Sequence, residues 1–349
     1  MILTVTLNTA LDITYRTPEL IPHATHRVGD VVERAGGKGL NVARVLAALG
    51  HETVVTGFAG GRTGDVVREL LGGCTAGGRA GPAGRTGSGP GRTRPGGGRA
   101  GSGGGRSAPA APTRPVDALV PISGATRRTI AVVDERTGDT TQLNEPGPLV
   151  SAAEWTTFLG SYDRLLTGAD AVALCGSLPP GIQVGAYAEL IRRARGAGVP
   201  VLLDTSGEPL RRGIAARPDL VKPNADELAG LTGSREPLRA THDARRRGAH
   251  AVVASLGPDG ILAATKDGVW QATPPSLAKG NPTGAGDSAV AGLISGLVEH
   301  LPWPARLTRA VALSMATVLS PTAGEFDAEA YEELLPRVTV TEHPAHPAA

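Results

Sequence analysis

The sequence predicts an α/β fold with a mostly parallel central sheet and a small β element standing apart from it. Short β-branched runs alternate with helical stretches along most of the 349 residues, and this alternation is typical of βαβ units. Two further segments, 27–36 and 126–144, read as strands without intervening helices. The stretch 72–115 lacks the large apolar residues that a packed core buries.

The strands of the main sheet are predicted from apolar runs that end at turn or polar residues. These runs are residues 4–8, 171–177, 199–204, 220–224 and 251–255. The first helix is predicted over 39–50, with apolar residues at mixed three- and four-residue spacings and Gly50 as its C-cap. Ser151 and Glu154 match a capping box, which predicts a second helix start.

The separate β element is predicted from two segments. Residues 27–36, RVGDVVERAG, read as one strand. Residues 126–144, TRRTIAVVDERTGDTTQLN, read as a hairpin that turns near Gly138.

The segment 72–115 contains 16 glycines, six prolines and seven arginines, and no Val, Leu, Ile, Met or aromatic residue. It cannot bury enough apolar surface to offset its chain entropy, which predicts disorder. A Gly/Arg tail that binds RNA is an alternative, although an RGG triplet and aromatic residues for base stacking are missing. A frameshifted stretch of a GC-rich gene is another. The segment follows a helix predicted at 65–71, where only a short connection is expected, and it could displace the next strand.

Charge and cysteine content exclude several classes of protein. Without 72–115 the chain has 28 basic and 33 acidic residues, a net charge of −5, which argues against nucleic-acid binding by the folded part. The two cysteines make neither a disulfide framework nor a metal cluster, and the first residues are not a signal peptide. No apolar run is long enough to span a membrane. We therefore expect a cytoplasmic protein.

The stretch NPTGAGDSAVAG, residues 281–292, has the features of a phosphate-binding helix start. Gly284 and Gly286 let a ligand approach the backbone, and the N–H groups of 284–287, Ala285 included, would stabilise charge on a transferred phosphoryl group. Asp287 is placed to accept a proton from an attacking hydroxyl. The alternative is that the glycines only form a turn and Asp287 only caps the helix.

A second glycine cluster, AGGKGLN at 35–41, also precedes a helix. Asn41 offers donors and acceptors to a polyol. The alternative is a tight turn with a solvated Lys38. Two glycine-rich helix starts in one chain suggest two ligands, a donor and an acceptor.

Both stretches, GGKGLNVARVLAALG and NPTGAGDSAVAGLI, resemble the two signatures of the ribokinase-like (PfkB) carbohydrate kinase family. The resemblance covers nearly the whole chain except 72–115. It implies a single kinase domain over 1–349 with a three-layer α/β/α fold, a mostly parallel central sheet and a β lid at about 12–34 and 117–146. It also implies ATP and Mg²⁺ as cofactors.

On the substrate side, TLNTALD at 6–12 resembles the family's first strand, with Asp12 holding sugar hydroxyls beside Gly37 and Asn41. CGSLPPG at 175–181 and the pair Thr126 and Arg127 resemble the branch that takes a sugar already carrying a phosphate. Arg127 would bind that phosphate in a bidentate manner, unless it is an exposed strand arginine.

Ser177 would donate its hydroxyl to the same phosphate, unless it is a simple turn residue. Lys38 and Arg27 are weaker candidates for this phosphate.

On the nucleotide side, KPNADEL at 222–228 and SLGPDG at 255–260 resemble the family. Asn224 and Glu227 would contact the phosphates of the Mg-nucleotide through water, with no direct metal ligand and Mg²⁺ near Glu227; the alternative is a capping box that only starts a helix. The other positions that the resemblance assigns to the nucleotide are Lys222, Ser255, Gly257 and Gly260.

Many family members have Asp-Thr where this chain has Asn281 and Pro282. Pro282 has neither an N–H nor a hydroxyl, so the cation or phosphate contact made by that threonine cannot be assumed here. This variant and TQLNEPGP at 141–148 resemble the 1-phosphofructokinase and tagatose-6-phosphate kinase branch.

The resemblance therefore predicts an ATP-dependent transfer of a phosphoryl group to the free primary hydroxyl of a ketohexose phosphate. A kinase of an unphosphorylated sugar or nucleoside and a non-catalytic sugar or nucleotide sensor are the alternatives. The expected partners are the phosphosugar and ATP, without nucleic acid or membrane. The family also allows a homodimer through paired lid strands.

Overall fold

The computed structural model describes residues 1–29, 31–73, 113–320 and 324–343. Within them, one large sheet has the strand order β15-β14-β13-β12-β11-β10-β9-β1-β4-β5, with β6 paired to β4. The strands from β5 to β12 are parallel, and those from β12 to β15 are antiparallel. Their bounds are β1 Ile2–Thr6, β4 Thr53–Gly60, β5 Val116–Asp117, β6 Val120–Ile122, β9 Ala171–Cys175, β10 Val201–Asp204, β11 Leu220–Val221, β12 Ala251–Ser255, β13 Ile261–Ala264, β14 Val269–Thr273 and β15 Thr339–His343.

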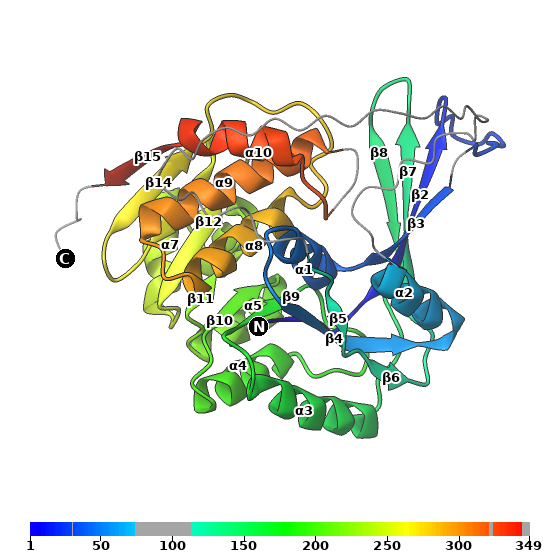
Figure 1. Cartoon of the computed structure of the whole chain (residues 1–349), viewed down its shortest axis with the longest axis horizontal. Coiled ribbons are helices and arrows are strands. Elements are labelled where there is room, and N and C mark those ends of the chain that lie inside the picture. The colour runs from blue at the N-terminus through cyan, green and yellow to red at the C-terminus, as the bar shows by residue number, and fades with distance from the viewer. Residues whose placement is uncertain (30, 74–112, 321–323, 344–349) are drawn as a thin grey trace, which may run out of the picture.

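Helices cover both faces of this sheet, which gives three layers (Figure 1). One face packs against α3 Ala152–Leu166, α4 Ala186–Gly196, α5 Gly207–Ala215, α6 Ala225–Thr232 and α7 Pro237–Arg246. The other packs against α1 Lys38–Ala48, α2 Gly61–Gly73, α8 Ala285–Val298, α9 Trp303–Leu319 and α10 Ala328–Leu334. Two short 3₁₀ helices, η1 Gly257–Asp259 and η2 Leu335–Arg337, complete the described elements. Because the parallel strands are covered on both faces, they are runs of Val, Leu, Ile and Ala that are almost fully buried.

Helix α8 packs against the sheet between α1 and α9. Its residues from Asp287 to Gly296 are all buried, which explains why the sequence is apolar around most of the helix. Gly292 allows the close approach of α9, since a Cβ there would lie 2.8 Å from the Cα of Ala310. The packing therefore fixes α8 and, with it, the loop that precedes it.

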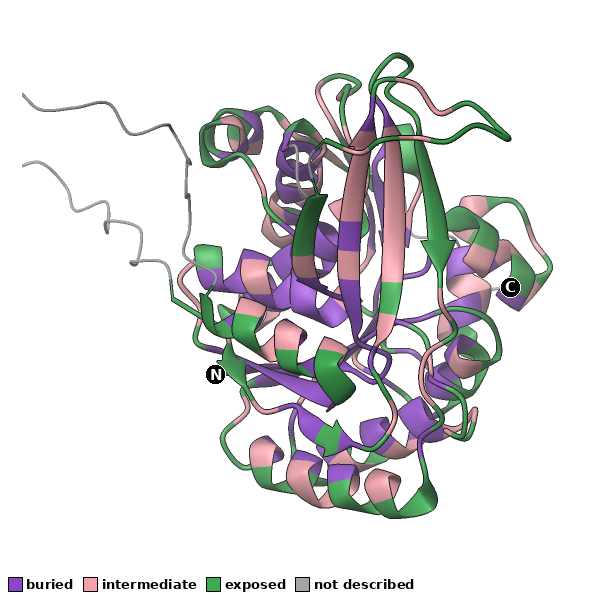
Figure 2. Ribbon diagram, turned by 90° about the vertical axis from the view of Figure 1, so that its right-hand side faces the viewer, coloured by how far each residue is buried: buried purple, intermediate pink, exposed green. Residues whose placement is uncertain are grey.

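A second sheet corresponds to the predicted lid and is called the lid below; it has the order β3-β2-β7-β8 and the bounds β2 Ala10–Thr17, β3 Val31–Gly36, β7 Arg127–Asp134 and β8 Thr140–Asn144. Its strands rise beside the main body (Figure 1). Figure 2 shows that most lid residues are intermediate or exposed, in contrast to the buried strands of the main sheet. The predicted hairpin is confirmed, because β7 and β8 pair in antiparallel fashion around Gly138.

The predicted lid boundaries need correction at 117–122. This stretch belongs to the main sheet, where β5 and β6 run parallel to β4. Burial of apolar side chains explains this placement, because Val120 and Ile122 lie in the core that also contains Phe158. The second lid segment thus begins at Arg127, and the strand predicted at 27–36 begins at Val31.

The segment predicted to be disordered, 72–115, is ordered at both of its ends. Gly72 and Gly73 complete α2, which begins at Gly61 and not at 65. Thr113 donates its N–H to the carbonyl of Ala47 at 3.0 Å, and Arg114 donates to the carbonyl of Gly72 at 3.0 Å. The predictions for 74–112 lie outside the described residues. None of the described helices is both long and apolar enough to cross a bilayer.

Candidate active site

Two adjoining clefts open where the parallel strands end. A polar cleft of about 770 Å³ lies between the sheet and the lid, and an apolar cleft of about 970 Å³ lies between α9 and the loops after β11 and β12. Asn224, Ser255 and Gly286 line both clefts. The carboxyl edge of a parallel sheet is where open α/β folds bind ligands, and the arrangement provides room for two ligands that meet near the start of α8.

The start of α8 carries free backbone donors. Gly284 is the N-cap with φ of +86°, a left-handed conformation that favours glycine, and no side chain caps the helix. The N–H of Ala285 donates to the carbonyl of Pro282 at 3.2 Å, so it is not available to a ligand as the sequence predicted. Among the described residues, the N–H groups of Gly286 and Asp287 have no acceptor. These two free donors indicate an anion site at the junction of the two clefts.

Asp287 is buried and does not cap the helix. Its Oδ2 accepts a hydrogen bond of 2.8 Å from Nδ2 of Asn41, a residue of α1. Burial raises the pKa of Asp287 to about 6, and the negative charge of Asp204 adds to this shift, while Asn41 and two lysines oppose it. A carboxylate with such a pKa is charged at neutral pH and can still accept a proton readily.

Two lysines flank a second buried carboxylate, Asp204, at the end of β10. Nζ of Lys38 lies 3.1 Å from its Oδ2, and Nζ of Lys222 lies 3.4 Å from its Oδ1. Burial would raise the pKa of Asp204, but the two lysines outweigh it and the pKa lies below its ordinary value. Burial would lower the pKa of Lys38, but Asp204 and Asp287 raise it above its ordinary value. Lys38 is therefore held in the charged state beside the junction.

The lid contributes a carboxylate and a guanidinium to the polar cleft. Asp12 of β2 pairs with Arg34 of β3, and its carboxylate lies over Gly36, where a Cβ would overlap it. Burial raises the pKa of Asp12 against the opposing charges of Arg44 and Arg127. The Nε of Arg127 donates to the carbonyl of Asn8 at 3.2 Å, which holds the guanidinium at the base of the lid.

Arg128 is the surface residue of the arginine pair. It is 54% exposed and forms an ion pair of 2.6 Å with Glu145. Arg127 lines the polar cleft instead, so the alternative of an exposed strand arginine applies to Arg128.

Ser177 lies in a loop that is fixed from two sides. Its Oγ accepts a hydrogen bond of 3.2 Å from Nδ2 of Asn8. The preceding carbonyl, that of Gly176, accepts bonds from the hydroxyls of Thr205 at 2.8 Å and Tyr187 at 3.0 Å. The loop therefore presents Ser177 to the polar cleft in a defined position.

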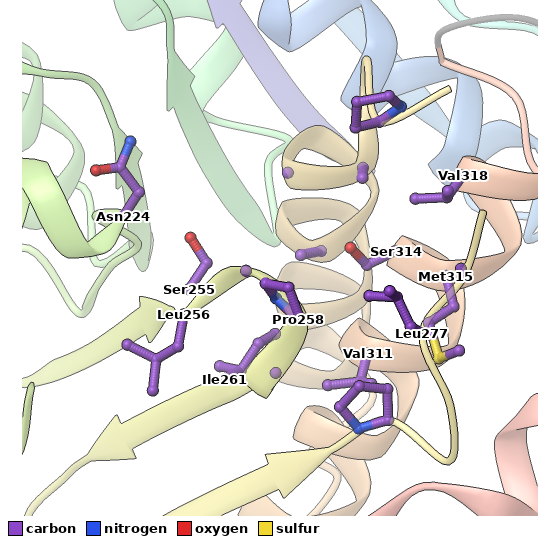
Figure 3. Close-up of a pocket in the computed structure, with 18 of the residues that line it drawn as sticks. Asn224, Ser255, Leu256, Pro258, Ile261, Leu277, Val311, Ser314, Met315 and Val318 are labelled. Atoms are coloured by element: carbon purple, nitrogen blue, oxygen red, sulfur yellow. The ribbon is translucent and has the colours of Figure 1, made fainter. Parts of the chain in front are cut away.

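The apolar cleft is lined by α9, by the start of α8 and by the loops after β11, β12 and β14. Figure 3 shows Val311, Met315 and Val318 on one side and Leu256 with Pro258 on the other. Such a cleft suits a flat aromatic base. The predicted nucleotide residues Ser255, Gly257 and Gly260 also line this cleft.

The capping box at 224–227 is confirmed. The Asn224 side chain accepts the N–H of Glu227 at 2.8 Å, and the Glu227 carboxylate accepts the N–H of Asn224 at 2.9 Å. Glu227 and Lys222 also line the polar cleft. Asn224 and Glu227 thus start a helix and still face the junction where a nucleotide's phosphates would lie.

Most of the predicted site residues converge on the two clefts. The polar cleft gathers Asp12, Gly37, Lys38, Asn41, Arg127, Ser177, Lys222, Asn224, Glu227, Ser255, Gly284, Gly286 and Asp287. Arg27 is exposed and lines neither cleft. The sequence predicted no role for Asn8 or Asp204. Asp204 could have been found as a carboxylate at the end of the buried strand β10, which pairs with β9, the strand that precedes Ser177.

No group of three or more His, Cys, Asp or Glu side chains that could hold a metal ion lies within the part of the chain described. A nucleotide-borne Mg²⁺ needs fewer protein ligands, because Mg²⁺ keeps several waters and binds one or two carboxylates plus phosphate oxygens. Glu227 is a carboxylate that lines the polar cleft.

A family model for pfkB family carbohydrate kinases matches residues 4–75 and 115–330. The chain belongs to the pfkB family of carbohydrate kinases. It is an enzyme that phosphorylates a sugar, and the family implies ATP as the co-substrate. The gap between the two matched ranges coincides with most of the segment 72–115.

Relatives of this pfkB kinase match over nearly its full length. It is 28% identical to the tagatose-6-phosphate kinase of Staphylococcus epidermidis, over 98% of this chain and 100% of that protein. Among solved structures, a mutant of phosphofructokinase-2 from Escherichia coli superposes with a TM-score of 0.80 and 27% identity, over 96% of this chain and 98% of that one. A protein from Thermotoga maritima described as a possible 1-phosphofructokinase has a TM-score of 0.77 and 26% identity, with 98% and 99% coverage. The predicted ribokinase-like α/β/α fold is confirmed.

Proposed function

We propose that this pfkB kinase transfers the γ-phosphoryl group of ATP to the free primary hydroxyl of a ketohexose phosphate. The observation that carries the proposal is the layout of the polar cleft. Cationic and hydroxyl groups of Arg127 and Ser177 lie at its lid side, and the buried Asp287 lies at its junction with the apolar cleft. The relatives named as tagatose-6-phosphate kinase and phosphofructokinase act on sugars of this class.

The substrate would lie with its phosphate on Arg127 and Ser177 and its hydroxyls on Asp12. A guanidinium offers a planar fork of donors that matches phosphate oxygens, and the Asn8 contacts hold both Arg127 and Ser177 in place. Asn41 would orient a sugar hydroxyl with its second N–H group, because the first donates to Asp287 while its Oδ1 accepts from Arg44.

Asp287 is the base in this proposal. It takes the proton of the primary hydroxyl while the hydroxyl oxygen forms a bond to the γ-phosphorus and the bond to the ADP oxygen breaks. The charge on the transferred group is stabilised by the N–H groups of Gly286 and Asp287 and by Lys222 and Lys38. A carboxylate pKa of about 6 leaves the base charged at neutral pH.

The nucleotide would place its base in the apolar cleft and its phosphates at the junction, over Asn224 and Ser255. Mg²⁺ on these phosphates would be held near Glu227 and would supply the charge compensation that phosphoryl transfer requires. Because the carboxylate of Glu227 also closes a capping box, we place it in contact with the ion through water.

The two other parts of the proposal concern assembly and location. Exposed apolar side chains on the lid, such as Val31 at 54% and Leu143 at 58%, support a homodimer through the lid strands. The phosphofructokinase-2 of Escherichia coli has a tetrameric inhibited form, so sedimentation velocity is the direct test of assembly. We place the enzyme in the cytoplasm, in keeping with its metabolic relatives.

A coupled assay of ADP formation tests the proposed reaction. The substrates are fructose 6-phosphate, tagatose 6-phosphate and fructose 1-phosphate, with fructose and ribose as unphosphorylated comparators. We expect a bisphosphate product, identified by ³¹P NMR, from at least one of the three phosphosugars. Turnover confined to fructose or ribose would refute the phosphosugar assignment, and absence of turnover on all five would refute it as well.

A further inference from the structure

The side-chain amide of Asn41 links Asp287 by hydrogen bonds to Arg44, which lines neither of the two clefts. Its Nδ2 donates to Asp287 at 2.8 Å, and its Oδ1 accepts from Nη1 of Arg44 at 2.8 Å. Arg44 lies one turn further along α1, and its Nη2 donates to the carbonyl of Ala35 in β3. The three side chains form a continuous chain from the lid strand to the buried carboxylate.

The hydrogen bonds from Arg44 to Asn41 and from Asn41 to Asp287 can run in this direction only, as long as Arg44 is present. A guanidinium only donates, so Oδ1 of Asn41 must face it and Nδ2 must face Asp287. The site is also crowded, because a Cβ at Gly324 would lie 2.7 Å from Oδ1 of Asn41 and 2.9 Å from Nη1 of Arg44. Gly324 thus closes the outer side of this pair.

Without Arg44 the amide could rotate by half a turn. This matters when Asp287 has taken the substrate's proton, because a neutral carboxyl can donate to Oδ1 of a flipped Asn41. That bond would stabilise the protonated form and delay the return of the base to its charged state. With Arg44 in place, Asn41 presents only its N–H group to Asp287, and this favours the charged form.

We propose that Arg44 is a positioning residue for Asp287, acting through the amide of Asn41. The proposal rests on the proposed function, in which Asp287 is the base. Arg44 touches neither the substrate nor the nucleotide in this account; its action is to fix one rotamer of one side chain.

Other charged groups also face Asp287, and the test has to separate them from Arg44. These groups are Asp204 from β10, Lys38 from α1 and Lys222 from the segment after β11. Arg44 also acts on Asp12, whose pKa it lowers together with Arg127 and Arg34. Loss of Arg44 could therefore affect activity through Asp12 without any change at Asn41.

A double-mutant cycle separates the two routes. We expect Arg44→Met to lower kcat about 10- to 100-fold, the range seen when an outer partner of a functional group is lost. The acid limb of the kcat profile should move to higher pH, because Asp287 loses an oriented donor. In the Asn41→Ala background, Arg44→Met should change kcat by less than about twofold, because the amide that Arg44 orients is then absent. Arg34→Met is the matched control, because it removes a lid arginine that also faces Asp12 and pairs with Glu325. The acid limb of its kcat profile should lie at the same pH as that of the parent.

A second readout does not need activity. The side-chain ¹⁵N resonance of Asn41, assigned by its loss in Asn41→Ala, should follow the titration of Asp287 near pH 6 in the parent and at higher pH in Arg44→Met. Equal effects of Arg44→Met in both backgrounds, or an unshifted Asn41 titration, would overturn the role of Arg44. If the parent phosphorylates none of the sugars, the proposed function fails, and the resonance alone decides whether Arg44 positions Asp287.

Discussion

The substitution Asp287→Asn separates the catalytic role of this residue from its effect on stability. Asparagine keeps the shape of the side chain, and its carbonyl can still accept the bond from Asn41. It cannot take the proton of an attacking hydroxyl. We expect kcat to fall by roughly 10²–10⁴, the contribution of a positioned general base, with little change in KM for either substrate.

The same substitution should make the protein more stable at neutral pH. The pKa of Asp287 rises from 3.8 to about 6 on burial. Each pKa unit corresponds to about 1.4 kcal/mol, so a difference of roughly two units means that the charged, buried carboxylate costs about 3 kcal/mol of unfolding free energy. Because the folded pKa is raised, this cost is absent below pH 3.8 and complete once the pH has risen through about 6.

Urea unfolding of the parent and Asp287→Asn at pH 8 and pH 5 measures this cost. We expect the variant to gain about 3 kcal/mol at pH 8 and about half of that at pH 5. Activity close to that of the parent would remove Asp287 from the role of base. A variant that is no more stable than the parent at pH 8, or equally stabilised at both pH values, would refute the burial argument.

Three further predictions concern the rest of the site. The kcat of the parent should fall below about pH 6, as Asp287 takes up a proton; a kcat that stays constant down to pH 5 would contradict this. Arg127→Gln should raise KM for the phosphosugar about 10- to 100-fold, as expected for a lost charge-assisted bond to phosphate. Arg128→Gln, its exposed neighbour, should change KM less than about twofold, and equal effects of the pair would argue against a phosphate site at Arg127. Val318→Trp should fill the apolar cleft and raise KM for ATP about tenfold or more while KM for the sugar stays the same; the opposite pattern would show that the nucleotide binds elsewhere.

The parts of the fold that depend on neighbouring residues were predictable from the sequence. The capping boxes at 151–154 and 224–227 form as predicted, because both partners lie within one helical turn. The hairpin at 127–144 likewise follows from its turn residues and its alternating pattern. The glycine-rich start of α8 was also recognisable, because Gly284 and Gly286 are informative about backbone conformation by themselves.

The parts that depend on distant pairs were not predictable. Asn41 and Asp287 are 246 residues apart, so no local pattern shows that the amide of one binds the carboxylate of the other. Asp204 gains its role only because β10 ends beside Lys38 and Lys222. The stretch 117–122 is a short apolar run that could belong to either sheet, and only its pairing with β4 and its packing with Phe158 assign it to the main sheet.

The most direct test of the central claim compares a sugar with its own phosphate ester under identical conditions. The kcat/KM for fructose 6-phosphate and fructose, and for tagatose 6-phosphate and tagatose, is measured with saturating ATP and Mg²⁺. The polar cleft with Arg127 and Ser177 predicts that at least one ester is preferred about 100-fold or more, equivalent to about 3 kcal/mol of transition-state binding. Equal or better use of the unphosphorylated sugars would contradict the account.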